Sequence, residues 1–327
     1  MQAETVNEIF NINNPATFDA TLNKVFSFQL NNNLLYAQWC KNVHHEQKKD
    51  LTSTQIPFLP ISFFKSHAVQ TTPFNADIFF ESSGTTNTIN SKHLVKQVEI
   101  YEQSFNTCFT NLYGSVDKYC IIGLLPSYLE RNSSSLVYMV NHWIQKSKFK
   151  ESGFYLNEFA QLAEVLQLLE QKKQPTLLIG VTFGLLDFVE QYSLSLKHTI
   201  VMETGGMKGR RKEMTRQEVH DILKKGFSVE NIHSEYGMTE LLSQAYSTGN
   251  GKFNCPPWMK VLVRAEDDPL QVSTTGKGIL NIIDLANVYS CSFIATDDVG
   301  IVYEDGSFEV QGRVDNCDIR GCSLLAV

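Results

Sequence analysis

The feature that most constrains the fold is an alternation of helical and strand-like segments in the middle of the chain. Apolar residues recur at helical spacing over residues 159–169, and a short apolar run follows at 176–181. Residues 183–192 have a helical pattern again, and residues 198–203 form a second strand-like run. Strands that alternate with helices are typical of parallel βαβ units. The pattern therefore predicts an α/β fold with mixed sheets flanked by helices.

The last third of the chain has a different pattern. Residues 278–284 read as a strand, and residues 300–310 read as a hairpin closed by an Asp-Gly turn. The length suggests either about two domains or one large α/β domain with lobes. With the family resemblance described below, we expect a single large domain over residues 1–327. Within it, an α/β lobe would cover about residues 1–240 and a small β-rich lobe residues 241–327.

Composition narrows the class of protein. The 327 residues are 43% apolar, as expected for a globular chain with a substantial core. Lys and Arg total 28 against 35 Asp and Glu, a net charge of −7, and no cluster of five or more basic residues occurs, so nucleic acid is not expected as a partner. The longest apolar run, residues 177–189, is too short to span a membrane.

The cysteines and the N-terminal residues indicate the compartment. Seven cysteines are present, an odd number without a CxxC pair, which favours reduced thiols over a disulfide framework or a zinc site. The first ten residues carry acidic side chains and no apolar core of signal-peptide length. These features predict a soluble protein of the cytoplasm.

One short loop gathers hydroxyl groups, a glycine and a cation. Small hydroxyl side chains and backbone N–H groups can surround anionic oxygens closely, and a lysine adds a mobile positive charge. The composition of the loop therefore fits phosphate binding, although a surface turn with self-satisfied hydroxyls is the commoner origin of such a cluster. The residues concerned are Ser82, Ser83, Gly84, Thr85, Thr86 and Lys92.

Further polar stretches follow strand-like runs, which is where open α/β sheets bind ligands. The Asp pair at 297–298 is expected at a strand end, where it would chelate a metal, bind a ribose diol or form a solvated turn. The GxGxxG, Walker and GxSxG motifs are absent. In chain order the stretches are Gly205-Gly206, Tyr236-Gly237-Met238-Thr239-Glu240, Thr296-Asp297-Asp298 and Gly312-Arg313-Val314-Asp315.

The order and spacing of four of these motifs resemble the adenylate-forming superfamily, which includes acyl-CoA synthetases and firefly luciferase. The four motifs begin at Ser82, Tyr236, Thr296 and Gly312. Within that superfamily the chain is most similar to the acyl-protein synthetase branch, known from the fatty-acid reductase of bacterial luminescence. This second likeness is carried by residues 56–65, 125–132 and 319–322.

The resemblance implies that ATP and Mg²⁺ convert a carboxylic acid, possibly long-chain, into an acyl-adenylate and pyrophosphate, and that the acyl group then passes to a thiol. It also implies roles for individual residues. Tyr236 and Gly237 would contact the adenine, and Thr239 the α-phosphate. The remaining implied contacts are those of Ser82, Ser83, Gly84, Thr85, Thr86 and Lys92 with the β- and γ-phosphates, of Gly205 and Gly206 with adenine and acyl group, of Glu240 with Mg²⁺, and of Asp298 and Arg313 with the ribose.

Three departures from the family pattern stand out. Asn87 occupies the position of a usual glycine, and extra residues separate it from Lys92. Asp297 replaces the glycine of the usual Thr-Gly-Asp. The chain also stops at the hinge motif, so we expect the small C-terminal lid domain, which carries a catalytic lysine in most relatives, to be absent.

In the acyl-protein synthetase branch a cysteine near the C-terminus accepts the acyl group, and the matching position here is Cys322, with Cys317 as the nearby competitor. A thiolate attacks an acyl-adenylate readily and gives a thioester. An acyl-accepting reductase or a carrier protein is the implied partner. Two other readings stay open. One is a ligase that uses CoA or a carrier-protein thiol, and the other is a non-catalytic nucleotide-binding protein.

Overall fold

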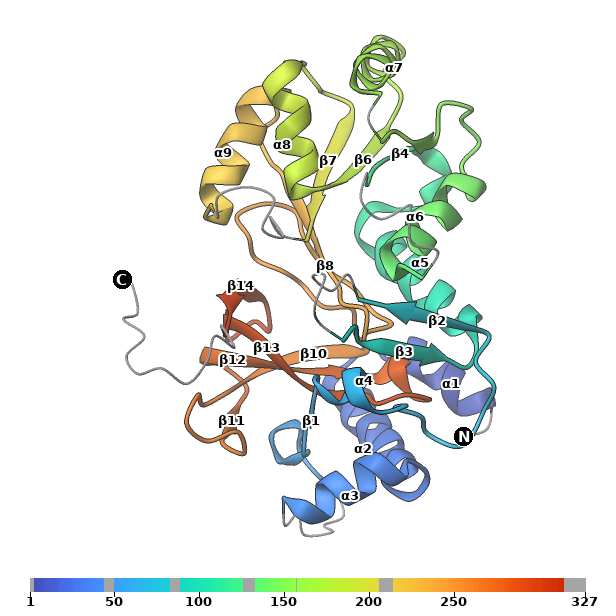
Figure 1. Ribbon diagram of the computed structural model, residues 1–327, viewed down its shortest axis with the longest axis vertical. Helices are drawn as coiled ribbons and strands as arrows, with labels where there is room; N and C mark the ends of the chain where they lie inside the picture. The colour runs from blue at the N-terminus through green and yellow to red at the C-terminus, as the bar shows by residue number, and fades with distance from the viewer. Residues whose placement is uncertain are drawn as a thin grey trace.

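The computed structural model describes residues 3–43, 50–82, 89–125, 133–156, 158–205 and 214–314. These residues form two lobes with a mixed α/β fold, which confirms the predicted class. Figure 1 shows the α/β lobe above and the β-rich lobe below, with the β2–β3 hairpin (Ile78–Glu81 and Lys92–Val95) at their junction.

The α/β lobe is built on a six-stranded sheet of order β5-β4-β6-β7-β8-β9, in which only the β8–β9 pair is antiparallel. Its two central strands are buried at every position except the half-buried Ile200, because helices cover both faces. The strands are β4 (Cys120–Leu124), β5 (Gly153–Phe154), β6 (Thr176–Val181), β7 (Thr199–Thr204), β8 (His233–Tyr236) and β9 (Ala245–Ser247).

The helices of this lobe lie on the two sides of the sheet. In Figure 1, α8 and α9 lie side by side on the left, and α5 and α6 lie on the right. The pair on the right is held by aromatic contacts, such as the edge contact of Phe105 with Trp143 at 5.8 Å. The helices are α5 (Val98–Tyr113), α6 (Ser135–Lys146), α7 (Phe159–Gln171), α8 (Thr182–Gln191) and α9 (Arg216–Phe227), and a 3-10 turn, η2, spans Val116–Lys118.

The β-rich lobe holds a second six-stranded sheet of order β1-β13-β12-β10-β11, with β14 paired to β13. The predicted hairpin is confirmed, because β13 and β14 are antiparallel neighbours joined by a turn that contains Gly306 at φ 81°. The strands are β1 (Leu59–Pro60), β10 (Met259–Arg264), β11 (Val272–Ser273), β12 (Gly276–Asp284), β13 (Phe293–Val302) and β14 (Phe308–Arg313).

The N-terminal segment packs against the β-rich lobe. Strand β1 is parallel to β13, with Pro60 opposite Ala295, and Gln29 donates hydrogen bonds to the carbonyls of Asn287 and Val288 at 3.1 and 2.9 Å. The lobe boundary that we expected at residue 240 would assign this N-terminal segment to the α/β lobe, although the segment packs against the sheet of the β-rich lobe. Its elements are α1 (Ala3–Phe10), α2 (Pro15–Asn32), α3 (Leu34–Asn42), η1 (Ser53–Gln55) and α4 (Phe63–Ser66), and η3 (Leu285–Asn287) follows β12.

One predicted position was wrong. Asp297 and Asp298 were expected at a strand end, but they lie in the middle of β13. The strand continues to Val302 because its second half pairs with β14, whose position in the chain is only six residues further on. Both carboxylates consequently project from a paired strand, whose backbone has less freedom than that of a turn.

Two further findings concern the class of protein. Within the described ranges, no helix combines the length and the apolar character needed to cross a membrane. Five cysteines of those ranges are free thiols, namely Cys40, Cys108, Cys120, Cys255 and Cys291.

Candidate nucleotide-binding cleft

A cleft of about 1180 Å³ lies between the two lobes. Its walls come from the carboxyl ends of the parallel strands β7 and β8 and from the paired strands β13 and β14. The end of β2, the short helix α4 and the first turns of α6 and α9 also line it. In open α/β sheets this edge is where ligands bind, since the loops after parallel strands meet there. The cleft is thus the place in the described structure with the size and position of a ligand site.

Asp298 is the centre of one polar cluster. It is 4% exposed, accepts a hydrogen bond from the Tyr236 hydroxyl at 2.7 Å, and accepts another from Arg313 Nε at 2.8 Å. Asp298 and Arg313 are opposite each other in the β13–β14 ladder, so strand pairing brings the two charges together. Burial, and then the Asp298 charge, raise the pKa of Tyr236 well above its ordinary value, so the phenol stays protonated as a donor.

The ring of Tyr236 forms part of an aromatic cluster beside the cleft. Its centroid is 5.4 Å from that of Phe308 and 5.8 Å from that of Phe253. With the hydroxyl held by Asp298, the ring has a fixed orientation. A ring fixed in this way offers a flat surface for a planar base.

The loop after β8 is fixed through its main chain. His93 of β3, which is fully buried, contacts the Thr239 carbonyl oxygen through Nδ1 at 2.8 Å. Asn287 Nδ2 donates to the Glu240 carbonyl oxygen at 2.7 Å. Two buried side chains from different parts of the fold therefore hold consecutive peptide groups of this loop, which restricts the positions of Thr239 and Glu240.

Glu240 lines the cleft although it is only 5% exposed. Burial raises its pKa, while a hydrogen bond from Ser91 opposes that shift by favouring the charged form. Within the described ranges, no three His, Cys, Asp or Glu side chains come together as a metal site. A single carboxylate does fit Mg²⁺, because that ion is commonly held by one or two carboxylates and the oxygens of a bound phosphate.

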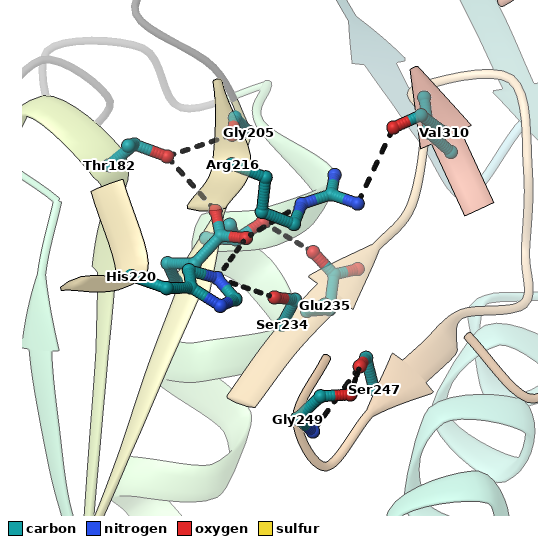
Figure 2. A network of polar contacts seen from close by, with 11 residues as sticks. Thr182, Gly205, Arg216, His220, Ser234, Glu235, Ser247, Gly249 and Val310 are labelled. Carbon is teal, nitrogen blue, oxygen red and sulfur yellow. Dashed lines mark hydrogen bonds and ion pairs between the residues drawn. The ribbon is translucent and has the colours of Figure 1, made fainter. Parts of the chain in front are cut away.

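A second polar cluster lies at the end of β7. Glu203 accepts a hydrogen bond from Thr182 at 3.0 Å and lies 3.6 Å from both Arg216 and His220. Figure 2 shows Arg216, His220 and Ser234 converging from α9 and β8. Burial raises the pKa of Glu203, but the His220 hydrogen bond and the Arg216 charge outweigh it, so its pKa lies below the ordinary value. Glu203 is therefore ionised and part of a buried ion pair.

Glu235 lies next to this cluster and behaves differently. Its carboxyl group accepts a hydrogen bond from Thr204, and it is 8% exposed on the cleft wall. Burial raises the pKa of Glu235 to about 7, and the nearby charge of Glu203 adds to the shift. A side chain at Gly237 would collide with the Glu235 carboxylate as it is placed, so any larger residue there would require that carboxylate to move. Sequence analysis missed both carboxylates. Glu203 ends the strand predicted at residues 198–203, and an acidic residue in a predicted strand was a visible signal, whereas Glu235 lies in a stretch for which no strand was predicted.

The structure brings most of the predicted site residues to the cleft. Gly205 directly follows β7 and has a φ of 72°, in the left-handed region that favours glycine. The predicted residues that line the cleft are Ser82, Gly205, Tyr236, Gly237, Thr239, Glu240, Asp298 and Arg313. Apart from Lys92, the others lie outside the described residues, namely Ser83, Gly84, Thr85, Thr86, Gly206 and Cys322, with the competitor Cys317.

Lys92 is placed differently from the prediction. It is exposed on the outer face of the β2–β3 hairpin, with Nζ 4.0 Å from the centroid of the Phe79 ring, and it is not among the residues that line the cleft. The alternation of strand side chains is the reason, since His93 occupies the inward face of β3 and its neighbour must point the other way.

Comparison with known proteins agrees with this architecture. Residues 10–326 match the family described as LuxE, acyl-protein synthetase. The long-chain-fatty-acid–luciferin-component ligase of Aliivibrio fischeri is 24% identical over 341 residues, which cover 94% of this chain and 86% of that protein.

Solved structures share the fold at low sequence identity. ATP-bound MatB from Rhodopseudomonas palustris superimposes with a TM-score of 0.53 at 13% identity, over 74% of this chain and 49% of that one. O-succinylbenzoate coenzyme A synthetase (MenE) from Bacillus subtilis, in complex with ATP and magnesium ion, has a TM-score of 0.51 at 14% identity, over 86% and 56%. The chain thus spans about half the length of these two proteins.

The comparison with solved structures concerns the fold, and the comparison with the family model concerns family membership. The structural matches show the fold of adenylate-forming enzymes, and the family match extends over nearly the whole chain, including every described wall of the cleft. The resemblance drawn from the four motifs is confirmed at both levels. The chain belongs to the LuxE acyl-protein synthetase family.

Proposed function

We propose that this chain activates a fatty acid with ATP to an acyl-adenylate and then transfers the acyl group to the thiol of Cys322. The observation that carries the proposal is the convergence of Tyr236, Glu240, Asp298 and Arg313 on one cleft in a chain of this family. These side chains provide an aromatic surface, a buried carboxylate for a metal and a carboxylate–arginine pair. They are the groups that a nucleoside triphosphate with Mg²⁺ requires.

In the proposed first step, a carboxylate oxygen of the acid attacks the α-phosphorus of ATP and pyrophosphate leaves. Two anions must approach each other, so the site must neutralise charge and fix an in-line geometry. Mg²⁺, held by Glu240 and the phosphates, would supply much of that charge. The loop of Ser82, Ser83, Gly84, Thr85 and Thr86 would surround the phosphate oxygens.

The nucleoside would be held by the cluster around Asp298. Each carboxylate oxygen of Asp298 has accepted one hydrogen bond, from Tyr236 or Arg313, and retains capacity for another. The ribose hydroxyls would donate to that remaining capacity, while the adenine would lie between the Tyr236 ring and Gly205. Thr239, whose carbonyl is held by His93, would present its hydroxyl to the α-phosphate.

In the proposed second step, the thiolate of Cys322 attacks the carbonyl carbon of the acyl-adenylate, a carbon–sulfur bond forms, and AMP leaves with the electrons of the broken carbon–oxygen bond. We further propose an acyl-accepting reductase or a carrier protein as the next acceptor of the thioester. The cytoplasmic location remains a prediction.

The test is ATP-dependent pyrophosphate release and hydroxamate formation over a panel of aliphatic and aromatic acids, followed by intact mass of the chain. We expect release with long aliphatic acids and a mass increase equal to one acyl group. The mass increase should vanish in Cys322→Ser and persist in the matched control Cys317→Ser.

The other readings give different results. Turnover that leaves the chain unmodified and acylates added CoA or a carrier thiol would favour the ligase reading and remove Cys322 from the mechanism. ATP binding without pyrophosphate release from any acid would favour a non-catalytic nucleotide-binding protein.

A further inference from the structure

Among the residues that the structure describes, the charge balance of the cleft is unfavourable for a polyphosphate. The described lining includes three cations, Lys65, Arg216 and Arg313, against six carboxyl groups, Glu81, Glu203, Glu235, Glu240, Asp297 and Asp298. ATP adds several further negative charges. A positive group that is free to contact the terminal phosphates would offset this charge, because hydrogen bonds between ionised partners are about twice as strong as those between neutral ones.

Both arginines of the lining are already engaged. Arg313 is bound to Asp298 at 2.8 Å. Arg216 lies 3.6 Å from Glu203, stacks over the Phe253 ring at 4.9 Å and donates to the Val310 carbonyl at 3.5 Å. The guanidinium group of each arginine is therefore already paired with a buried carboxylate.

Lys65 is different. It is exposed in α4 and, among the residues that the structure describes, forms no ion pair with a carboxylate. Lys92, the lysine that the family resemblance would assign to the phosphates, has its ammonium group over the Phe79 ring on the outer face of the hairpin. The cleft therefore has one unpaired cation in its described lining, and that cation is Lys65.

The fold holds Lys65 at a defined place. Strand β1 pairs with β13 one residue before Thr296, and α4 follows directly. The neighbouring residue, Phe64, is buried and contacts the ring of His93 edge-on at 5.8 Å. Because His93 is also bound to the Thr239 carbonyl, α4 is connected through packed side chains to the loop of Glu240.

The same wall of the cleft contains the described part of the hydroxyl loop. Ser82 and Ser91 are joined by two hydrogen bonds, from Ser82 N to the Ser91 carbonyl at 3.1 Å and from Ser91 N to Ser82 Oγ at 2.9 Å. Ser91 precedes β3, on which Phe64 packs through His93. Lys65 and these serines therefore line the cleft from adjoining segments.

We propose that Lys65 is the cation that contacts the terminal phosphates of the bound nucleotide, in place of Lys92. The proposal rests on the proposed function for the identity of the nucleotide. The flexible four-carbon stem of a lysine suits a contact that forms only when the ligand arrives, and its ammonium group suits phosphate as a point charge.

The test measures ATP and AMP affinity of the full chain by calorimetry in the presence of Mg²⁺, for wild type, Lys65→Ala, Lys65→Arg and Lys92→Ala. A charge-assisted hydrogen bond to phosphate corresponds to roughly a 10- to 100-fold change in affinity. We expect Lys65→Ala to weaken ATP binding by that factor and to change AMP binding by less than about threefold. Lys65→Arg should restore most of the ATP affinity. Lys146→Ala, on the exposed end of α6, is the control for loss of a surface charge.

Three results would overturn the proposal. The first is a Lys65→Ala variant that binds ATP as tightly as the wild type, and the second is an equal loss of ATP and AMP affinity in that variant, which would indicate a distorted fold. The third is a larger loss of ATP affinity in Lys92→Ala than in Lys65→Ala. Failure of the proposed function is distinguishable, because a chain that binds ATP through Lys65 but releases no pyrophosphate with any acid would retain the binding result.

Discussion

Protonation of His93 should limit the stability of this protein at low pH. The side chain is fully buried between Phe64 and the loop that carries Thr239. Burial lowers the pKa of His93 to about 4, although its contact with the Thr239 carbonyl opposes the shift. Its other ring nitrogen, Nε2, is buried without a hydrogen bond of normal geometry. The nearby Asn287 side chain also opposes the shift, but burial outweighs both contacts. The ring is therefore neutral at pH 7.

The magnitude follows from proton linkage. An unfolded histidine has a pKa of about 6.5, so between that value and about 4 the unfolded chain binds a proton that the folded chain does not. Stability is then lost as the pH falls through this window. At about 1.36 kcal/mol for each pKa unit, the whole shift corresponds to about 3 kcal/mol, a large part of the stability of an ordinary domain.

The variant His93→Asn separates titration from hydrogen bonding. An asparagine amide can still donate to the Thr239 carbonyl, but it does not titrate. We expect the free energy of unfolding of the wild type, measured by urea denaturation, to fall by about 3 kcal/mol more than that of His93→Asn between pH 7 and pH 4. The matched control is His67→Asn, at an exposed position at the end of α4, which should follow the wild type.

The change of unfolding free energy with pH is more informative than its value at one pH. His93→Asn also loses the aromatic contact with Phe64, and this loss lowers its stability at every pH. Parallel curves for wild type and His93→Asn over the whole pH range would refute the reasoning, since they would show that His93 takes up its proton as easily in the folded chain as in the unfolded one.

Three further predictions concern the cleft. Glu240→Gln should reduce Mg²⁺-dependent pyrophosphate release by about 100-fold or more while leaving the unfolding transition intact, and unchanged release would remove Glu240 from the metal site. Asp298→Ala leaves Tyr236 and Arg313 without their acceptor, so the KM for ATP should rise roughly 10- to 100-fold, and an unaltered KM would contradict the ribose contact. Burial raises the pKa of Glu235 to about 7, so ionising Glu235 destabilises the folded chain as the pH rises from 4.5 to 7. Between pH 4.5 and pH 8, the free energy of unfolding of Glu235→Gln, measured in urea titrations, should rise by about 3 kcal/mol relative to that of the wild type. Equal pH dependence of the two proteins would argue against the raised pKa.

The local elements of the α/β lobe were predictable from the sequence. The strand at 176–181 was predicted with its observed bounds, and the helix expected at 183–192 begins and ends one residue earlier, at Thr182 and Gln191. Hydrophobic periodicity determines such elements because it reflects contacts between residues a few positions apart. The order of the polar motifs along the chain also pointed to the family.

Contacts between distant segments were decided only by the tertiary structure. Asp298 and Arg313 are partners because of the register between β13 and β14, and a shift of one residue would point their side chains to opposite faces. The alternation of side chains in β3 likewise turned Lys92 away from the cleft and His93 toward Thr239.

The position of the N-terminal segment also depends on contacts between residues far apart in the sequence. Its helical pattern is visible in the sequence, but the pairing of β1 with β13, more than two hundred residues away, is not. That pairing brings Lys65 to the cleft. The sequence by itself thus determined which residue types were available for a nucleotide site, whereas strand register and long-range pairing decided which of them face it, because these depend on the packing of the whole chain.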